Sequence, residues 1–230
     1  MQAKNYKDTF SYDIVIIGGL GHIGLPLGLV FAHKGKRVCL FDIDIEKAKL
    51  VKKGIMPFIE YGAEPVLKEV LQKGRIRITD DVREVATARY VIIAIGTPVD
   101  EYFNPKTRVF LELISKIKGY LSCEQTIIVR STVYPHTCQQ MLKLLGDDKN
   151  WRIAYCPERI IQGYAIKELP VLPQIVAGLS SEAVEDAVKL FSIICHKVIR
   201  TSMGEAELVK LFTNSWRYIQ FAVTNQFYMI

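Results

Sequence analysis

One hydrophobic run that ends in glycines constrains the fold of this chain more than any other feature. The run DIVIIG passes directly into GGLGHIG and then into a helix-spaced segment. Gly19, Gly21 and Gly24 fit the pattern G-x-G-x-x-G between a hydrophobic strand and a helix. In that pattern the first glycine allows a tight turn, the second lets the backbone approach a pyrophosphate, and the third brings the helix against the strand. The sequence therefore predicts a dinucleotide-binding loop at the start of an α/β domain.

A carboxylate at the end of the next strand predicts which dinucleotide this loop binds. Asp42 ends the run RVCLFD, eighteen residues after Gly24, where a carboxylate accepts hydrogen bonds from the adenosine ribose. The same negative charge repels a 2′-phosphate, so the sequence favours NAD over NADP. We expect His22 and Ile23, which lie between the second and third glycines, to contact the cofactor as well. Asp44 is the rival carboxylate, but it is better placed to cap the helix that begins IEKAK.

Short runs rich in β-branched residues alternate with helix-spaced segments along most of the chain. Several of the runs are apolar on both faces, as strands covered by helices on two sides must be. Strands are predicted at 13–18, 37–42, 75–79, 90–96, 126–131, 152–156, 174–178 and 197–200, and helices at 22–34, 44–53, 62–73, 110–121, 135–146 and 181–194. This order predicts an α/β fold with a Rossmann-like, doubly wound and mostly parallel sheet.

The pattern changes near the C-terminal end of the sequence. From Met203 onward one uninterrupted helix-like segment follows, with no strand after it. We therefore expect a NAD-binding domain over residues 1–200 and the start of a long central helix over residues 201–230.

Polar residues follow three of the predicted strands. The fourth strand ends in GTP with Thr97, the fifth ends in RSTV with Ser131 and Thr132, and the sixth ends in YCPER with Glu158 and Arg159. In a doubly wound sheet, ligands lie beyond the carboxyl ends of the strands. Any one of these ends also fits an ordinary turn. Three of them at one edge predict a cleft.

A polar stripe marks the C-terminal helical segment. Glu207, Lys210, Asn214 and Arg217 recur at helical spacing, while large apolar residues cover most of the remaining surface. A helix that is apolar nearly all round is expected to be buried, so the stripe would face an internal cavity. The alternative is a solvated face with a Glu–Lys pair, and spacing alone leaves both interpretations open.

The composition argues against several other classes of protein. The chain has 230 residues, half of them hydrophobic, and a net charge of +6. Its Lys and Arg residues are scattered, which argues against a nucleic-acid-binding protein. Glycines and a proline interrupt the one stretch long enough to span a membrane, so we expect no membrane partner. Five cysteines without a CxxC pair or a metal-ligand spacing predict no metal site and suit a reducing compartment, hence the cytoplasm.

The ordered motifs GLGHIGLPLG, FDID, GTP, STVYP, AYCPERI and GEAELVKLFTNSWR resemble those of the UDP-glucose/GDP-mannose dehydrogenase family. The stretches AYCPER and NSWR are most similar to its UDP-N-acetylmannosamine dehydrogenase branch. The resemblance covers nearly all of residues 12–230. It implies oxidation of the C6 hydroxyl of a UDP-sugar to a carboxylate with two NAD⁺, through a cysteine-bound thiohemiacetal and thioester.

The resemblance also implies roles for single residues. Lys210 and Asn214 would polarise and stabilise the C6 oxygen, and Thr132 and Glu158 would position or activate water. These four are the expected catalytic residues.

A second group of residues is expected to bind ligands. The resemblance implies that Arg159 and Arg217 contact the substrate, as Glu158, Lys210 and Asn214 also would. Thr97 and Ser131 would line the nicotinamide side of the site, together with Thr132.

Two departures from the family pattern matter. Gln162 stands where many relatives carry a second glutamate, which shifts the expected substrate preference and leaves the base for thioester hydrolysis open. Nothing in the sequence matches the family's nucleophilic cysteine or its second, UDP-binding domain, and Cys156 reads as a packed strand-end residue. We therefore expect an N-terminal fragment that binds NAD without completing the oxidation, taken from a full-length protein that forms a homodimer.

Two other functions remain open from the sequence. A β-hydroxyacid dehydrogenase also pairs a Rossmann domain with a Lys-x-x-x-Asn helix, although the YCPER motif argues against it. A non-enzymatic module that binds NAD and exposes an apolar helix to a partner is the third possibility.

Overall fold

The computed structural model describes residues 10–96, 101, 107–146 and 149–230. Its centre is one eight-stranded sheet with the strand order β3-β2-β1-β4-β5-β6-β7-β8. The strands are β1 (Tyr12–Ile17), β2 (Val38–Phe41), β3 (Ile76–Thr79), β4 (Ala88–Ile93), β5 (Thr126–Val129), β6 (Arg152–Tyr155), β7 (Gln174–Gly178) and β8 (Val198–Arg200). Neighbouring strands are parallel except β6 and β7, which are antiparallel. The prediction of a doubly wound, mostly parallel sheet is confirmed.

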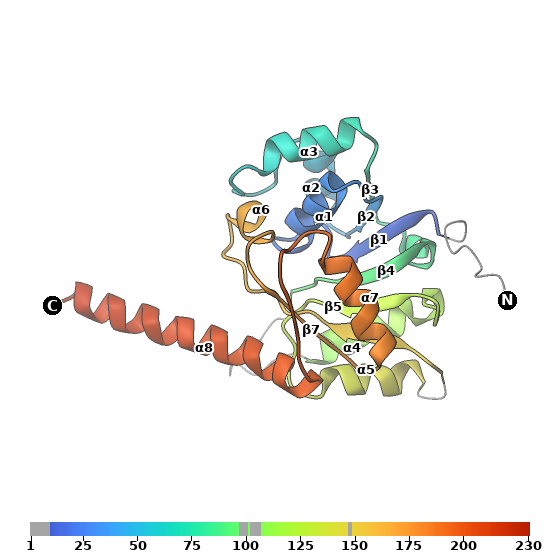
Figure 1. The fold of residues 1–230 in the computed structure, drawn as a ribbon. Helices are drawn as coiled ribbons and strands as arrows, with labels where there is room; N and C mark the ends of the chain where they lie inside the picture. Colours follow the sequence, from blue (N-terminus) through green and yellow to red (C-terminus); the bar gives the residue numbers. More distant parts are fainter. Residues whose placement is uncertain (1–9, 97–100, 102–106, 147–148) are drawn as a thin grey trace.

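Helices connect the strands and cover the sheet (Figure 1). They are α1 (Gly24–His33), α2 (Ile45–Lys52), α3 (Ala63–Gln72), α4 (Thr107–Ile117), α5 (Thr137–Leu145), α6 (Ala165–Glu168), α7 (Ser181–Phe191) and α8 (Met203–Tyr228). Within the described residues, the 3-10 helix η2 (Val82–Thr87) precedes β4 and the 3-10 helix η3 (Lys118–Tyr120) follows α4. Each of the predicted strands and helices is present, whereas α6 and η2 fall in segments for which the sequence pattern predicted no helix.

Alternation along the buried strands separates two hydrophobic cores. In β1, Ile14 and Ile16 pack in the core that α1, α3 and α7 cover, whereas Val15 and Ile17 pack in the core that α4, α5 and the first turn of α8 cover. Successive side chains of a strand point to opposite faces, so one apolar run fills both cores. The sheet is therefore a rigid, doubly covered platform for the loops at its carboxyl edge.

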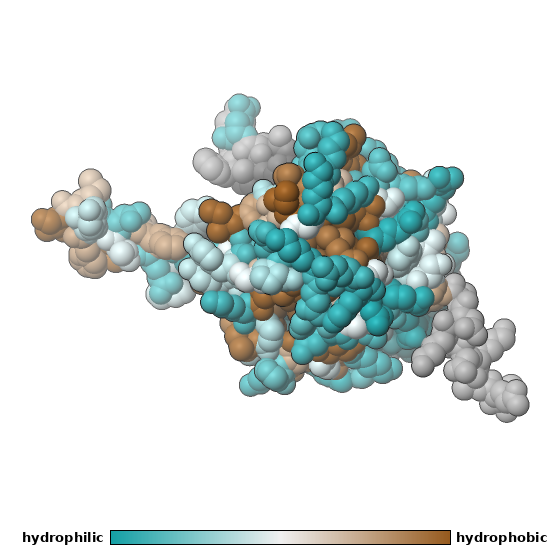
Figure 2. Space-filling model, turned by 90° about the horizontal axis from the view of Figure 1, so that it is seen from above, coloured by the Kyte–Doolittle hydropathy of each residue, from teal (hydrophilic) through white to brown (hydrophobic). Residues whose placement is uncertain are grey.

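Helix α8 extends away from the body of the fold (Figure 1). It begins with a capping box in which Ser202 and Glu205 satisfy each other's backbone N–H groups. Only Met203, Ala206 and Glu207 are buried within it. The expectation that this helix is buried is wrong for the described chain, because apolar side chains such as Trp216 are exposed along its length. Figure 2 shows hydrophobic residues, in brown, among more polar ones on the projecting part of α8.

Among the residues that the structure describes, no helix combines the length and the apolar character that crossing a membrane requires. The division between a domain over 1–200 and a helix over 201–230 stays a prediction, although α8 itself begins at Met203.

Candidate cofactor and substrate site

The carboxyl edge of the sheet and helix α8 line a cavity of about 760 Å³. It lies where the connections from β1 and β4 leave in opposite directions, which is the place where doubly wound sheets bind ligands. Its walls come from five segments: Gly21, His22 and Ile23 after β1; Ala94, Ile95 and Gly96 after β4; Arg130, Ser131 and Thr132 after β5; Glu158, Ile160, Ile161 and Gln162 after β6; and Lys210, Arg217 and Phe221 from α8. The predicted cleft at the strand ends is present.

Two of the three glycines in the loop are packed closely against the protein, and the third borders open space. A Cβ atom on Gly19 would lie 2.8 Å from the Leu40 Cα atom, and one on Gly24 would overlap the carbonyl oxygen of Gly18. A Cβ atom on Gly21 would meet nothing closer than the Gly18 oxygen at 3.4 Å, an ordinary contact. The fold therefore needs glycine at positions 19 and 24, whereas at position 21 the bare backbone leaves room for a ligand in the cavity. This open cradle fits the pyrophosphate of a dinucleotide.

Asp42 links the end of β2 to the glycine loop. Its carboxylate accepts hydrogen bonds from the backbone N–H groups of Leu20 at 2.9 Å and Asp44 at 3.1 Å. The carboxylate is therefore fixed beside the loop, as a ribose acceptor would have to be. Asp44 caps α2 by accepting the N–H of Lys47 at 2.9 Å, which confirms its predicted structural role.

His22 and Ile23 complete the turn into α1. The His22 ring lies 4.1 Å from the ring of Phe58, centroid to centroid, and Ile23 is the N-cap residue of the helix. Both residues line the cavity, and their contact with the cofactor stays a prediction.

The loop after β5 supplies two hydroxyl groups to the cavity wall. The Ser131 hydroxyl donates to the carbonyl of Ile95 at 2.8 Å, which ties this loop to the end of β4. Thr132 lines the cavity next to it. The predicted nicotinamide residue Thr97 lies outside the described residues.

Glu158 is held by a buried arginine that sequence reasoning did not assign to the site. The Arg130 guanidinium forms an ion pair with the Glu158 carboxylate and is only 2% exposed. It also donates to the carbonyl of Cys156 at 3.2 Å and to the side chain of Gln174 at 3.0 Å, and it lies over the Phe191 ring. Its place near the carboxyl end of the predicted strand 126–131 could have indicated this ion pair, because an arginine on a strand buried on both faces requires a counter-charge.

The Glu158 carboxylate has further donors in its own loop. One oxygen accepts the backbone N–H groups of Arg159 and Ile160, at 2.5 Å and 2.6 Å. Since its other oxygen is paired with Arg130, the carboxylate fixes the shape of this wall. In this arrangement Glu158 is better suited to position a group than to take a proton.

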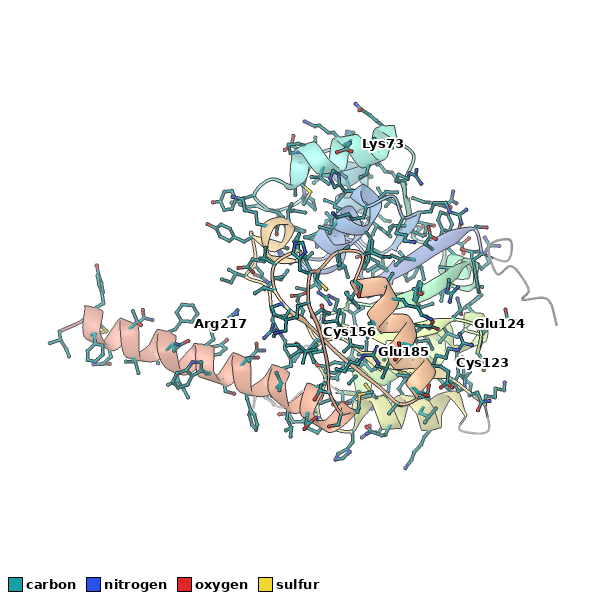
Figure 3. The ribbon with its side chains drawn as sticks, viewed as in Figure 1. Lys73, Cys123, Glu124, Cys156, Glu185 and Arg217 are labelled. Carbon is teal, nitrogen blue, oxygen red and sulfur yellow. The ribbon has the colours of Figure 1, made fainter. Side chains whose placement is uncertain are left out.

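The α8 stripe is divided between the cavity and the rest of the fold. The Lys210 amine donates to the backbone carbonyl of Glu158, and Arg217 lines the cavity farther along the helix (Figure 3). Glu207 points elsewhere, to the N-terminus of α5. Asn214 is half-buried, and among the described residues the cavity wall includes neither it nor Arg159, whose guanidinium donates to the Pro173 carbonyl at 2.7 Å.

Burial and charge make this cavity suitable for an anion. Burial lowers the pKa of Lys210 from its ordinary value, and the neighbouring Glu158 opposes that change while Arg217 adds to it. The charged side chains on the described wall are Arg130, Lys210 and Arg217 against the single carboxylate of Glu158. The excess positive charge favours a phosphate-bearing ligand.

Cys156 is chemically inert despite its place beside Glu158. The side chain is fully buried, and burial raises the pKa of its thiol to about 12. A thiol of this kind is not a thiolate nucleophile near neutral pH. The prediction that Cys156 is a packed strand-end residue is confirmed, and Figure 3 shows it inside the body of the fold.

Comparison with known proteins identifies the fold and its cofactor. Residues 12–194 match the pattern of the UDP-glucose/GDP-mannose dehydrogenase family, NAD binding domain. The UDP-N-acetyl-D-mannosamine dehydrogenases of Pyrococcus horikoshii and Methanocaldococcus jannaschii are 31% and 30% identical to the chain, over 94% and 97% of its length. The alignments cover 53% and 52% of those two proteins, so the chain spans about half the length of the curated relatives it matches.

A solved structure agrees with the sequence match. The structure of UDP-D-ManNAc dehydrogenase from Pyrococcus horikoshii superimposes with a TM-score of 0.86, covers 94% of this chain and 53% of that chain, and is 31% identical. Because the family pattern covers most of the chain and the cavity has the open glycine loop that a dinucleotide needs, the chain belongs to the UDP-glucose/GDP-mannose dehydrogenase family and carries its NAD-binding domain.

Proposed function

We propose that this chain supplies the cofactor half of a nucleotide-sugar 6-dehydrogenase acting on UDP-N-acetylmannosamine or a close UDP-hexose. The observation that carries the proposal is the single cavity shared by the open glycine loop, the Ser131–Thr132 loop and the Lys210 amine. The relatives named above support the substrate class, and the excess of positive charge on the wall supports a diphosphate ligand.

The cofactor would be held at the glycine end of the cavity. Gly19, Gly21 and Gly24 would receive the pyrophosphate with His22 and Ile23, and Asp42 would accept the ribose hydroxyls. Ser131, Thr132 and Thr97 would lie toward the nicotinamide. Bound NAD⁺ supplies a hydride acceptor, and the remaining work falls to the protein side chains.

The reacting carbon would lie between the β5 loop and α8. The Lys210 amine, near the cavity and partly desolvated, would donate a hydrogen bond to the C6 oxygen and stabilise its negative charge, with Asn214 beside it. Glu158 would hold the opposite wall in place through its backbone partners, and Thr132 would orient water. Arg217 and Arg159 would bind the substrate, the former directly from the cavity wall.

Two further assignments belong to this proposal. We propose a cytoplasmic protein, which the five unpaired cysteines support, since thiols stay reduced there. We also propose a homodimer for the full-length protein, which the exposed apolar side chains of α8, such as Phe212 and Trp216, support. Sedimentation equilibrium with and without NAD would test the dimer, and a monomer at every concentration would contradict it.

Cofactor preference gives a direct test of the NAD site. The chain is expected to bind NADH about tenfold more tightly than NADPH, because the Asp42 carboxylate repels a 2′-phosphate. Asp42→Asn should remove most of this difference, as measured by cofactor fluorescence titration. The matched control is Asp44→Asn, two residues away, which removes an equal charge and keeps the α2 cap, since asparagine caps a helix about as well as aspartate, and it should leave the preference unchanged. Equal affinities for the two cofactors in the unaltered chain would contradict the assignment of Asp42.

The substrate class is tested separately. In the full-length protein, NADH formation is followed with UDP-N-acetylmannosamine, UDP-glucose and a small β-hydroxyacid, each with NAD⁺ in excess. The proposal expects NADH with a UDP-sugar and none with the hydroxyacid. The reverse result would assign the chain to the β-hydroxyacid chemistry that a Lys-x-x-x-Asn helix also allows.

A further inference from the structure

Three glutamates are buried, and each one accepts hydrogen bonds from the backbone N–H groups of a loop or helix start. Glu158 accepts N–H groups from its own loop, and Glu60 accepts those of Gly163 at 3.2 Å and Ile166 at 3.4 Å. Glu207 is the most deeply buried of the three, at 1% exposed. A buried carboxylate needs such donors, because the cost of removing its charge from water is otherwise not offset.

Glu207 is the one of the three that links α8 to the rest of the fold. It belongs to α8, and its carboxylate accepts the backbone N–H of His136 at 2.8 Å and that of Cys138 at 3.4 Å. Those two residues open α5, at the end of the connection that carries Ser131 and Thr132. Through one side chain, α8 is therefore fixed to the loop that forms the opposite wall of the cavity.

The start of α5 depends on this carboxylate. The N-cap residue His136 has a φ of 70°, the left-handed region, and makes no side-chain cap hydrogen bond of its own. The first N–H groups of a helix need acceptors, and a negative charge there also interacts favourably with the helix dipole. Glu207 supplies both from a different helix, so the strained turn before α5 and the position of α8 are stabilised together.

Lys210 lies one turn after Glu207 on the same side of α8. Beyond Glu207 the helix makes no fully buried contact within the described chain, since its other buried residues are Met203 and Ala206. The Glu207 carboxylate is thus the last buried contact before the Lys210 amine reaches the carbonyl of Glu158. Loss of that contact would let this turn of the helix move relative to the cavity.

We propose that Glu207 is a positioning residue that sets the register of α8 against the Ser131–Thr132 loop and thereby holds the Lys210 amine at the cavity wall. Its link to catalysis rests on the proposed function, in which Lys210 stabilises the C6 oxygen. The positional part concerns this chain alone and needs neither substrate nor cofactor.

The experiment measures the state of Lys210 in the chain carrying Glu207→Gln. Each lysine is acetylated competitively over a range of pH, and the peptide containing Lys210 is followed by mass spectrometry. In the unaltered chain, burial holds the pKa of this amine below its usual range, with Glu158, Arg217, Arg130 and Arg159 as its charged neighbours. Glu207→Gln replaces an acceptor with an N–H donor facing α5, so the amine should move toward water and its pKa should rise by about half a unit or more.

Glu205→Gln is the matched control. Glu205 lies two residues earlier on the same helix, is exposed, and belongs to the capping box of α8 itself. The Glu205→Gln substitution weakens the start of α8 but removes no contact with α5, so the pKa of Lys210 should not change. Backbone amide exchange at His136 and Cys138 should accelerate in Glu207→Gln and stay unchanged in Glu205→Gln.

Two outcomes would overturn the proposal. The first is a folded Glu207→Gln variant with faster exchange at α5 but an unchanged pKa of Lys210, which would make Glu207 a helix cap only. The second outcome concerns Glu207→Asp, the variant used if Glu207→Gln does not fold, which keeps the charge and shortens the side chain by one methylene. A smaller rise in the pKa of Lys210 is expected for this variant, and no rise would overturn the proposal. A failed UDP-sugar oxidation with the expected labelling result would count against the proposed function and leave the positioning role standing.

Discussion

Gly21→Ala is expected to weaken NADH binding by about tenfold or more, or ~1.4 kcal/mol, while leaving the thermal stability of the chain nearly unchanged. The new Cβ atom would meet only the Gly18 oxygen at 3.4 Å, so the fold accommodates it. In the cavity, however, the methyl group would occupy the space into which a pyrophosphate must approach the backbone. Isothermal titration with NADH and differential scanning calorimetry on the same sample measure the two effects.

Gly24→Ala is the matched comparison, and for this variant a loss of stability is expected. Its Cβ atom would overlap the Gly18 carbonyl, so the turn must open and the chain should lose about 1–3 kcal/mol of stability. The pair separates a glycine that the ligand requires from one that the fold requires. Unchanged NADH affinity in Gly21→Ala would mean that the open side of the loop does not face the cofactor.

Arg130→Met is expected to produce the largest loss of stability, about 3–5 kcal/mol. The substitution keeps an apolar stem of similar length but leaves the buried Glu158 carboxylate without its ion-pair partner. It also removes the hydrogen bonds to the Cys156 carbonyl and to Gln174. Urea unfolding at neutral pH gives the free energy of unfolding directly.

The double variant Arg130→Met/Glu158→Gln tests the physical reason for this loss. Removing the charge of Glu158 as well should recover part of the stability, so the double variant should lose less than the sum of the two single variants. The exposed pair Arg200–Glu185 serves as the control, and breaking it with Arg200→Met should have a much smaller effect because water screens it. Strictly additive losses at Arg130 and Glu158 would show that the ion pair contributes nothing beyond packing.

Local sequence patterns predicted most of the fold. The period of apolar residues distinguished strands from helices, and alternation in strands such as 13–18 anticipated the two cores on opposite faces of the sheet. Segment 165–168 escaped prediction because one helical turn is too short to establish a period.

The candidate site was predicted less completely. Gly21, His22, Ser131 and Lys210 were expected at one cavity and line it. Asn214 lies between Lys210 and Arg217 in the same stripe, yet it is off the described wall that both of them line. Helical spacing defines a stripe of side chains but not which members of that stripe reach the cavity.

By itself, the amino-acid sequence determined the order and type of the elements, the glycine loop and the carboxylate that follows β2. These features depend on backbone preferences and on the periodic burial of neighbouring residues, and both are encoded within short windows. Only the tertiary structure decided which charges meet. Arg130 pairs with Glu158 across 28 residues, Lys210 reaches the Glu158 carbonyl across 52, and Glu207 holds the backbone of His136 across 71. A buried charge requires a partner, but which partner it finds depends on how the sheet brings distant strand ends together.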